Sequence, residues 1–136
     1  YIRVYGFDMS YGRFELSLTS ASQILTNDWC EDAEPISRYM TLPGSTSFAS
    51  WDHHLGSCGD ASAAVGNGVW YIFEGDGSTV AASTCEGTDF DTQISVFTGE
   101  CRDLECVDGS GQFCGDQSAV RWDSIFGARY YIFVHV

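Results

Sequence analysis

Hydrophobic and polar residues alternate with a period of two through much of the chain. Phe14, Leu16 and Leu18, for example, are separated by single polar residues. Side chains of a β-strand point alternately to its two faces, so this pattern predicts strands that bury one face. The segments that alternate in this way, or that are rich in β-branched and aromatic residues, are residues 1–7, 14–19, 36–42, 69–74, 79–83, 94–97, 120–123 and 129–136.

Turn-forming residues separate the predicted strands. They are concentrated at residues 8–12, 75–78 and 108–111, and in a longer connection over residues 45–68. No window of eleven or more residues carries hydrophobic positions at helical spacing, and the fifteen glycines suit many short turns. We therefore predict an all-β fold in which two antiparallel sheets pack as a β-sandwich.

Length and charge narrow the classes of partner. The chain has 136 residues, the size of one domain, and 44% of them are hydrophobic, enough for a packed core. Nineteen acidic residues face six arginines and no lysine, which gives a net charge of −13 and excludes nucleic acid and anionic membranes as default partners. The apolar runs are too short for a membrane helix, so no membrane insertion is expected. The chain opens without a leader, which predicts a mature chain or a piece of a longer one.

The chain contains six cysteines, an even number, and no pair of them has the spacing of a zinc site. Disulfides formed in an oxidising compartment are therefore expected, and with them an extracellular location. Fifteen pairings are possible. Sequence proximity favours a local bridge between Cys101 and Cys106, a bridge between Cys85 and Cys114 around the strand at residues 91–97, and by remainder a bridge between Cys30 and Cys58.

The two ends of the chain resemble each other. Residues 131–136 (Tyr-Ile-Phe-Val-His-Val) repeat the tyrosine, isoleucine and valine of residues 1–6 (Tyr-Ile-Arg-Val-Tyr-Gly) at an offset of 130 residues. The chain stops within a predicted strand, whereas residues 1–18 read as a strand, a turn and a second strand without a beginning. This pattern predicts that each end supplies what the other lacks.

In its order of motifs the chain resembles the bacterial pre-peptidase C-terminal (PPC) domain and its tandem-repeat relatives. The matching segments are Asn-Asp-Trp-Cys-Glu-Asp-Ala (27–33), Gly-Val-Trp-Tyr-Ile-Phe (68–73), Ala-Ser-Thr-Cys (82–85), Phe-Asp-Thr-Gln-Ile-Ser-Val-Phe-Thr-Gly (90–99), Cys101, Leu104, Cys106, Cys114-Gly115 and Tyr-Tyr-Ile (130–132). The closing turn and strand of the family pattern stand at the front here, as residues 4–18. The family's acidic stretch reads Val-Asp-Gly-Ser-Gly (107–111), and Trp29 replaces a small polar residue.

This resemblance implies a jelly-roll-like β-sandwich without catalytic activity, used as an accessory binding module or as a unit of surface arrays. It divides the chain into residues 1–20, closing strands that complete a neighbouring or the same sandwich, and residues 21–136, the sandwich body.

Candidate chemical sites are few. An enzyme is the least favoured class, because His53 and His54 belong to no catalytic motif, and we expect His135 to be a surface or interface side chain. No cofactor is expected except calcium, for which the candidate ligands are Asp89, Asp91, Asp108 and Asp116. Aromatic residues near turns suggest sugar stacking, with Trp29 and Trp51 as the main candidates beside Tyr5, Tyr11 and Tyr39, whereas Trp70, Tyr71, Phe73 and Trp122 are expected in the core.

The leading hypothesis is an extracellular structural repeat that assembles head-to-tail into a surface filament, either by strand complementation between chains or as tandem covalent repeats. Its partner is then another copy of itself, and the expected contacts are between the opening ribbon (Tyr1, Ile2, Val4, Phe14, Leu16 and Leu18) and the closing strand (Tyr131, Ile132 and Val134). Two alternatives stay open. One is an accessory domain of a secreted enzyme or adhesin in which the ribbon folds back into its own sandwich, and the other is a polysaccharide-binding module.

Overall fold

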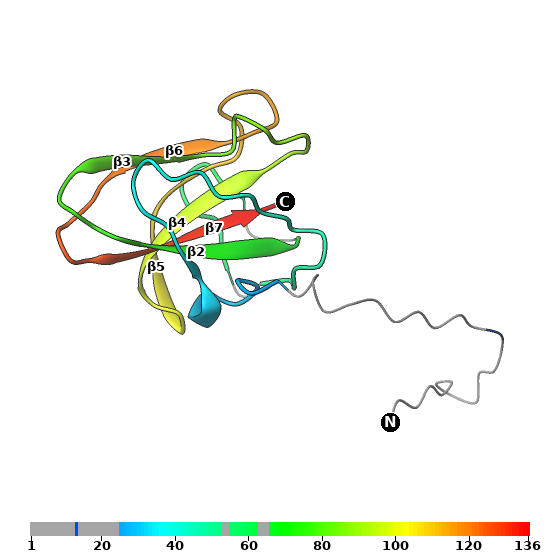
Figure 1. Ribbon diagram of the computed structural model, residues 1–136, viewed down its shortest axis with the longest axis horizontal. Helices are drawn as coiled ribbons and strands as arrows, with labels where there is room; N and C mark the ends of the chain where they lie inside the picture. Colours follow the sequence, from blue (N-terminus) through cyan, green and yellow to red (C-terminus); the bar gives the residue numbers. More distant parts are fainter. Residues whose placement is uncertain (1–12, 14–24, 53–54, 63–65) are drawn as a thin grey trace.

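The computed structural model describes residue 13 and residues 25–52, 55–62 and 66–136 (Figure 1). Within these ranges the chain is all-β, as predicted, and contains no α-helix. A 3₁₀ turn, η2 (Cys30–Asp32), precedes seven strands: β1 (Glu34–Pro35), β2 (Gly68–Glu74), β3 (Thr79–Ser83), β4 (Gln93–Glu100), β5 (Asp103–Ser110), β6 (Ala119–Asp123) and β7 (Arg129–His135). They form a five-stranded sheet in the order β1-β2-β7-β4-β5 and a two-stranded sheet of β3 and β6.

The central strands of the five-stranded sheet, β2, β7 and β4, are buried on both faces. Strands β2 and β7 pair antiparallel along their whole length, and β4 pairs with the other side of β7. Side chains on one face, among them Val69 and Tyr71, pack against β3 and β6, while Trp70 and Phe133 on the opposite face pack with Leu55 and Cys58. Burial of both faces explains why residues 69–73 and 130–134 are almost continuously apolar rather than alternating.

The two-stranded sheet covers only part of the larger one. Val80 and Ala82 of β3 and Val120 and Trp122 of β6 point toward the core, and the residues between them are polar or small and more exposed. These two strands therefore show the period of two that their sequence predicts. The expected core positions of Trp70, Tyr71, Phe73 and Trp122 are confirmed.

Two local predictions are wrong. Residues 36–42 form an irregular segment instead of a strand, because only Ile36 continues the pairing with β2 before a turn in which Met40 N bonds Ser37 O and Tyr39 takes a positive φ of 65°. Residues 103–110 form strand β5 instead of a short loop and a turn. The strand is largely exposed, so its sequence lacks an apolar face and was not recognised.

All six cysteines form disulfides, which indicates an oxidising and secretory environment. The Cys85–Cys114 bridge is confirmed, but the other two pairings are wrong: the bridges are Cys30–Cys101 and Cys58–Cys106. A local Cys101–Cys106 bridge does not form because residues 103–106 are extended, which carries Cys106 about 10 Å along β5 from its start. A disulfide requires Cα atoms within roughly 7 Å.

His135 is buried, so the expectation of a surface side chain is wrong. Its ring stacks on Phe133 with 4.8 Å between centroids, and Nε2 lies 3.3 Å from Ser95 Oγ. Burial lowers the pKa of His135 below its ordinary value, since the charged ring loses its hydration. The imidazole is therefore part of the core and of the β2–β7–β4 packing.

Candidate functional site

The outer edge of β3 is open along its whole length. Thr84 N donates to Ser118 O and Ser124 N donates to Ser78 O, each at 2.9 Å, at the two ends of the β3–β6 ladder. Hydrogen bonding alternates along an antiparallel strand, so Val80 and Ala82 also bond β6, whereas the N–H and C=O groups of Thr79, Ala81 and Ser83 point the other way. No described residue pairs with these outward groups, which makes the edge a template for a further strand.

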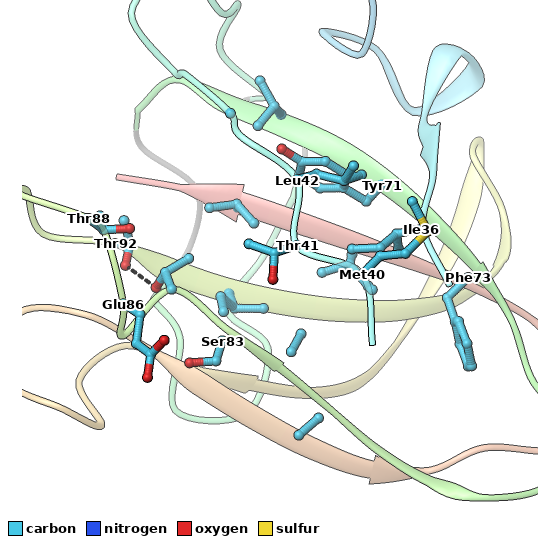
Figure 2. A pocket seen from close by; sticks show the side chains of 18 of the residues that line it. Ile36, Met40, Thr41, Leu42, Tyr71, Phe73, Ser83, Glu86, Thr88 and Thr92 are labelled. Carbon is cyan, nitrogen blue, oxygen red and sulfur yellow. Dashed lines mark hydrogen bonds between the residues drawn. The ribbon is translucent and has the colours of Figure 1, made fainter. Parts of the chain in front are cut away.

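An apolar groove lies beside this edge (Figure 2). Its volume is about 280 Å³, and it runs between β3 and the irregular segment at residues 36–46. The floor is formed by the inner face of the five-stranded sheet, including Tyr71, Ile94 and Ile132, and one wall by residues 80–84. A strand that paired with β3 would place alternate side chains over this floor.

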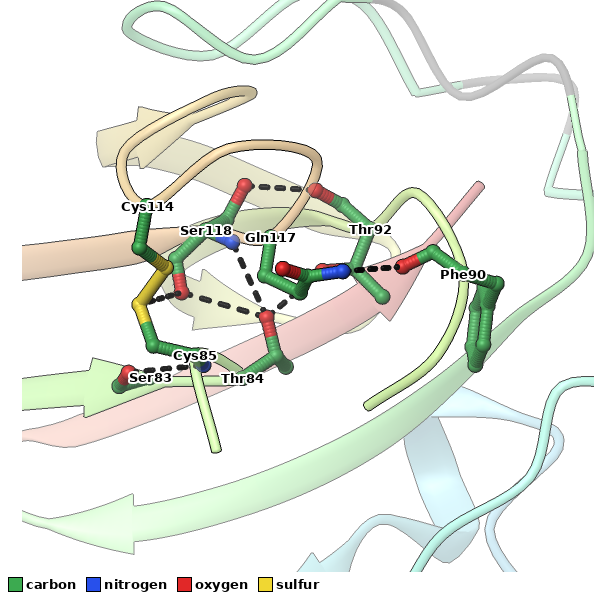
Figure 3. The surroundings of a disulfide bond; sticks show 8 residues. All are labelled: Ser83, Thr84, Cys85, Phe90, Thr92, Cys114, Gln117 and Ser118. Carbon is green, nitrogen blue, oxygen red and sulfur yellow. Dashed lines mark hydrogen bonds between the residues drawn. A yellow bond between two sulfur atoms is a disulfide. The ribbon is translucent and has the colours of Figure 1, made fainter. Parts of the chain in front are cut away.

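Hydrogen bonds and a disulfide hold the Ser83 end of the edge (Figure 3). Thr84 Oγ1 lies 2.6 Å from Thr92 Oγ1 and accepts from Ser118 N, while Ser118 Oγ donates to Thr92 O at 2.6 Å. The Cys85–Cys114 bridge lies next to this network. The end of β3 is thus fixed relative to β4 and β6.

An ion pair holds the Thr79 end. Arg38 Nε lies 2.8 Å from Asp76 Oδ2, and Arg38 Nη1 donates to Ser78 Oγ. Hydrogen bonds from Ser78 and, to a smaller extent, the charge of Arg38 lower the pKa of Asp76. The segment that forms the far wall of the groove is therefore joined to the turn that starts β3.

Two edges of the five-stranded sheet are covered. Asp60 N donates to Gly109 O of β5, and the Cys58–Cys106 bridge covers the same strand. The two-residue β1 covers one side of β2. The outer edge of β6 is also unpaired among the described residues, but the groove lies beside β3.

The predicted contacts on the closing strand are not available for strand pairing. Tyr131, Ile132 and Val134 lie in β7, whose two edges are occupied by β2 and β4. A strand cannot add beside them in this sheet, so a contact of the ribbon with these residues would have to be made through side chains. Ile132 and Val134 instead line the groove beside β3. Their predicted partners Tyr1, Ile2, Val4, Phe14, Leu16 and Leu18 lie outside the described residues, as do His53 and His54.

The four candidate calcium ligands do not converge. Asp89, Asp91 and Asp116 are exposed, and Asp108 Oδ1 accepts from the adjacent Gly109 N. In the part of the chain that the structure describes, no three histidine, cysteine or acidic side chains gather as a metal site. The calcium hypothesis therefore has no support in this arrangement.

The two candidate sugar-binding tryptophans are exposed, Trp29 by 52% and Trp51 by 56%. Trp29 directly follows Asp28, and Trp51 directly follows Ser50. These two preceding residues are hydrogen-bonded to each other: Asp28 Oδ2 accepts from Ser50 Oγ at 2.8 Å, and Asp28 Oδ1 accepts from Ser50 N. Trp29 also lines a hollow together with Asp52 and Arg102. The aromatic rings and polar groups are thus placed near one another.

Sequence reasoning did not find the open β3 edge. The order of strands in a sheet depends on long-range pairing, for which the period of two gives no signal.

Among the described residues no helix is long and apolar enough to cross a membrane. Comparisons with protein-family models, curated proteins and solved structures find no match to this chain.

Proposed function

We propose that this chain is a non-catalytic structural unit of an extracellular filament or appendage, in which residues 14–18 of one copy add as a strand to the β3 edge of another. The observation that carries the proposal is the unpaired edge of β3 beside an apolar groove. Donated strands of this kind bind through main-chain hydrogen bonds, and alternate side chains fill the groove.

The sequence of residues 14–18 suits the groove. Phe14, Leu16 and Leu18 are apolar and would face the floor, whereas Glu15 and Ser17 would face solvent. Five strand residues span roughly 17 Å and match the five residues of β3. The resemblance to the PPC domain supports the same role, because that pattern places such a segment at the end of the sandwich.

Charge also favours a specific contact. Residues 1–20 contain two arginines and two acidic residues and are neutral, whereas the rest of the chain contains four arginines and seventeen acidic residues. The acidic bodies repel one another in random encounters. A neutral ribbon carries no such penalty, which favours contact through the ribbon.

The connection between ribbon and body favours a ribbon from another copy. Asn27 O accepts from Trp70 N near the start of β2, so residue 25 enters the body at the opposite end from the β2–β3 turn. From Leu18 to Leu25 the chain spans at most about 25 Å. If the ribbon folded back onto β3 of its own chain, Leu18 would most easily lie at the Ser83 end, near residue 25, and the ribbon would run parallel to β3. An antiparallel ribbon in its own chain would need the connection from Leu18 to Leu25 to be almost fully stretched. A ribbon donated by another copy can run antiparallel, the more stable pairing.

The proposal is tested by sedimentation velocity of the full chain with its disulfides intact. We expect a ladder of oligomers that grows with concentration, and linear particles by electron microscopy. Leu16→Asp should leave a monomer, because a carboxylate cannot enter the apolar groove. Glu15→Gln is the matched control and should assemble like the wild type.

A monomeric wild-type chain at all concentrations would contradict the proposal and favour a ribbon folded into its own sandwich. Assembly of Leu16→Asp at the wild-type level would equally contradict it. A synthetic peptide of residues 12–20 should bind Leu16→Asp and should shorten wild-type polymers by occupying the β3 edge.

A second candidate function is polysaccharide binding. The exposed rings of Trp29 and Trp51, placed beside the Asp28–Ser50 pair, favour it. Titration of neutral polysaccharides into the chain should then quench tryptophan fluorescence, and Trp29→Ala should abolish the effect. Absence of quenching across a range of neutral polymers would exclude this candidate.

A further inference from the structure

Four large apolar side chains are exposed in two segments that both contact the turn between β2 and β3: residues 39–40, next to Arg38, and residues 125–126 in the turn between β6 and β7. We call them the turn patch: Tyr39 (96% exposed), Met40 (48%), Ile125 (70%) and Phe126 (83%). A cluster of large, well-exposed apolar side chains on a strongly acidic protein is typical of a contact surface. The described residues leave it uncovered.

Hydrogen bonds hold the patch in place. Gly127 N donates to Gly75 O at 2.7 Å, which joins the two turns, and Ile125 N donates to Tyr130 Oη at 2.9 Å, which fixes Ile125. The Arg38 guanidinium lies 5.4 Å from the centre of the Tyr39 ring while it pairs with Asp76. Docking on such an ordered surface costs little conformational entropy.

The patch lies at the Thr79 end of β3. Asp76 and Ser78, which Arg38 contacts, belong to the turn that starts β3, and Met40 also lines the groove. The body is entered at residue 25 near the start of β2, which is the opposite end of the sandwich (Figure 1). The turn patch and the ribbon attachment therefore occupy opposite ends of one molecule.

We propose that the turn patch docks the body of the copy whose ribbon occupies the groove. This inference rests on the proposed function. An antiparallel ribbon ends with Leu18 beside Thr79, and residues 19–24 then hold the donor's body within about 25 Å of that point. This distance is less than the diameter of a domain of this size, which brings the donor's body within reach of the patch.

The same geometry determines how copies are arranged. The ribbon-attachment end of one copy rests on the turn patch of the next, and every copy points in the same direction. The contact is heterologous and does not close on itself, so it propagates into a linear array. A parallel ribbon would instead bring the donor's body to the Ser83 end of β3, where Phe113 is exposed.

The first experiment compares self-association of two variants of the full chain by sedimentation velocity. Tyr39→Ser combined with Phe126→Ser should weaken assembly by at least about tenfold, because two aromatic anchors leave the contact. Phe113→Ser is the matched control and should assemble like the wild type. If the double variant assembles like the wild type, or if Phe113→Ser is the variant that weakens assembly, the inference is overturned.

The second experiment separates this inference from the proposed function. A peptide of residues 12–20 carries no body, so it should bind Leu16→Asp equally well with and without the two patch substitutions. A nitroxide at the carboxyl end of the peptide should broaden the amide signals of Ser78 and Thr79. Broadening at Thr84 and Cys85 instead would overturn the docking inference while the groove still bound its strand. Failure of the peptide to bind would contradict the proposed function itself.

Discussion

The two sheets of this sandwich differ in how completely their strands are satisfied. In the five-stranded sheet β7 is paired on both sides and both faces are buried, with Trp70 and Phe133 entirely inaccessible. In the two-stranded sheet β3 has one partner, one buried face and an open edge beside a groove. The first sheet is paired and buried at its centre, whereas the second leaves an edge of β3 unpaired among the described residues.

The disulfides follow the same division between the two sheets. The bridges Cys30–Cys101 and Cys58–Cys106 both join loops to the β4–β5 hairpin of the larger sheet, across 71 and 48 residues of sequence. On the chain-entropy model each contributes roughly 4 kcal/mol. The two bridges therefore stabilise the larger sheet, and under the proposed function the smaller sheet receives the donated strand.

The largest expected effect is a loss of stability in the five-stranded sheet. Phe133→Ala should lower the free energy of unfolding by about 3–5 kcal/mol, because it removes a ring that packs against Trp70 and His135. Chemical denaturation of the monomeric Leu16→Asp chain measures this loss. Phe113→Ala, at an exposed position, is the matched control and should change the value by less than about 0.5 kcal/mol. Equal losses would remove the distinction between buried and open regions.

The next prediction tests which side of β3 carries the unpaired edge. Ala81→Pro should abolish assembly and lower the free energy of unfolding by less than about 1 kcal/mol, because the lost N–H points away from β6. Ala82→Pro should cost about 3 kcal/mol, since its N–H bonds β6. Thermal unfolding and sedimentation together distinguish the two variants. If Ala81→Pro were the more destabilising variant, the free edge would be assigned to the wrong side of β3.

The smallest expected effect is the pH dependence of stability that arises from His135 in β7 of the five-stranded sheet. Its folded-state pKa is lowered by burial, so the unfolded chain binds the proton more readily. The neutral His135 ring contributes its full stabilisation of the fold above about pH 6.5, the ordinary pKa of histidine. This contribution is lost as the pH falls toward the lowered folded-state pKa. Denaturant midpoints of Leu16→Asp should fall across this interval, and His135→Asn should fall less. Identical pH profiles would show that His135 does not titrate between folded and unfolded chains.

The sequence predicted most of the strands but not how they associate. The period of two identified β3 and β6, and continuous apolar runs identified β2 and β7. Strand β5 was missed because it is an exposed strand held by β4 and a disulfide, so its sequence carries no apolar face. Residues 36–42 were misjudged because the same apolar side chains can line a groove without strand pairing.

Long-range pairing accounts for the remaining errors. Which cysteines meet depends on how the hairpin of β4 and β5 packs against residues 30 and 58, and that packing leaves no mark in local spacing. The central place of β7 likewise follows from its pairing with both β2 and β4. The open edge could be found only after these pairings were known.

Hydrogen exchange of the Ala81 amide, measured by NMR or mass spectrometry at increasing protein concentration, tests the central claim most directly. We expect this amide to exchange rapidly in monomeric Leu16→Asp and to become protected in the wild-type chain as it assembles, while the Ala82 amide stays protected in both. Rapid exchange of the Ala81 amide in fully assembled wild-type polymers, or concentration-independent protection in a wild-type monomer, would contradict the account.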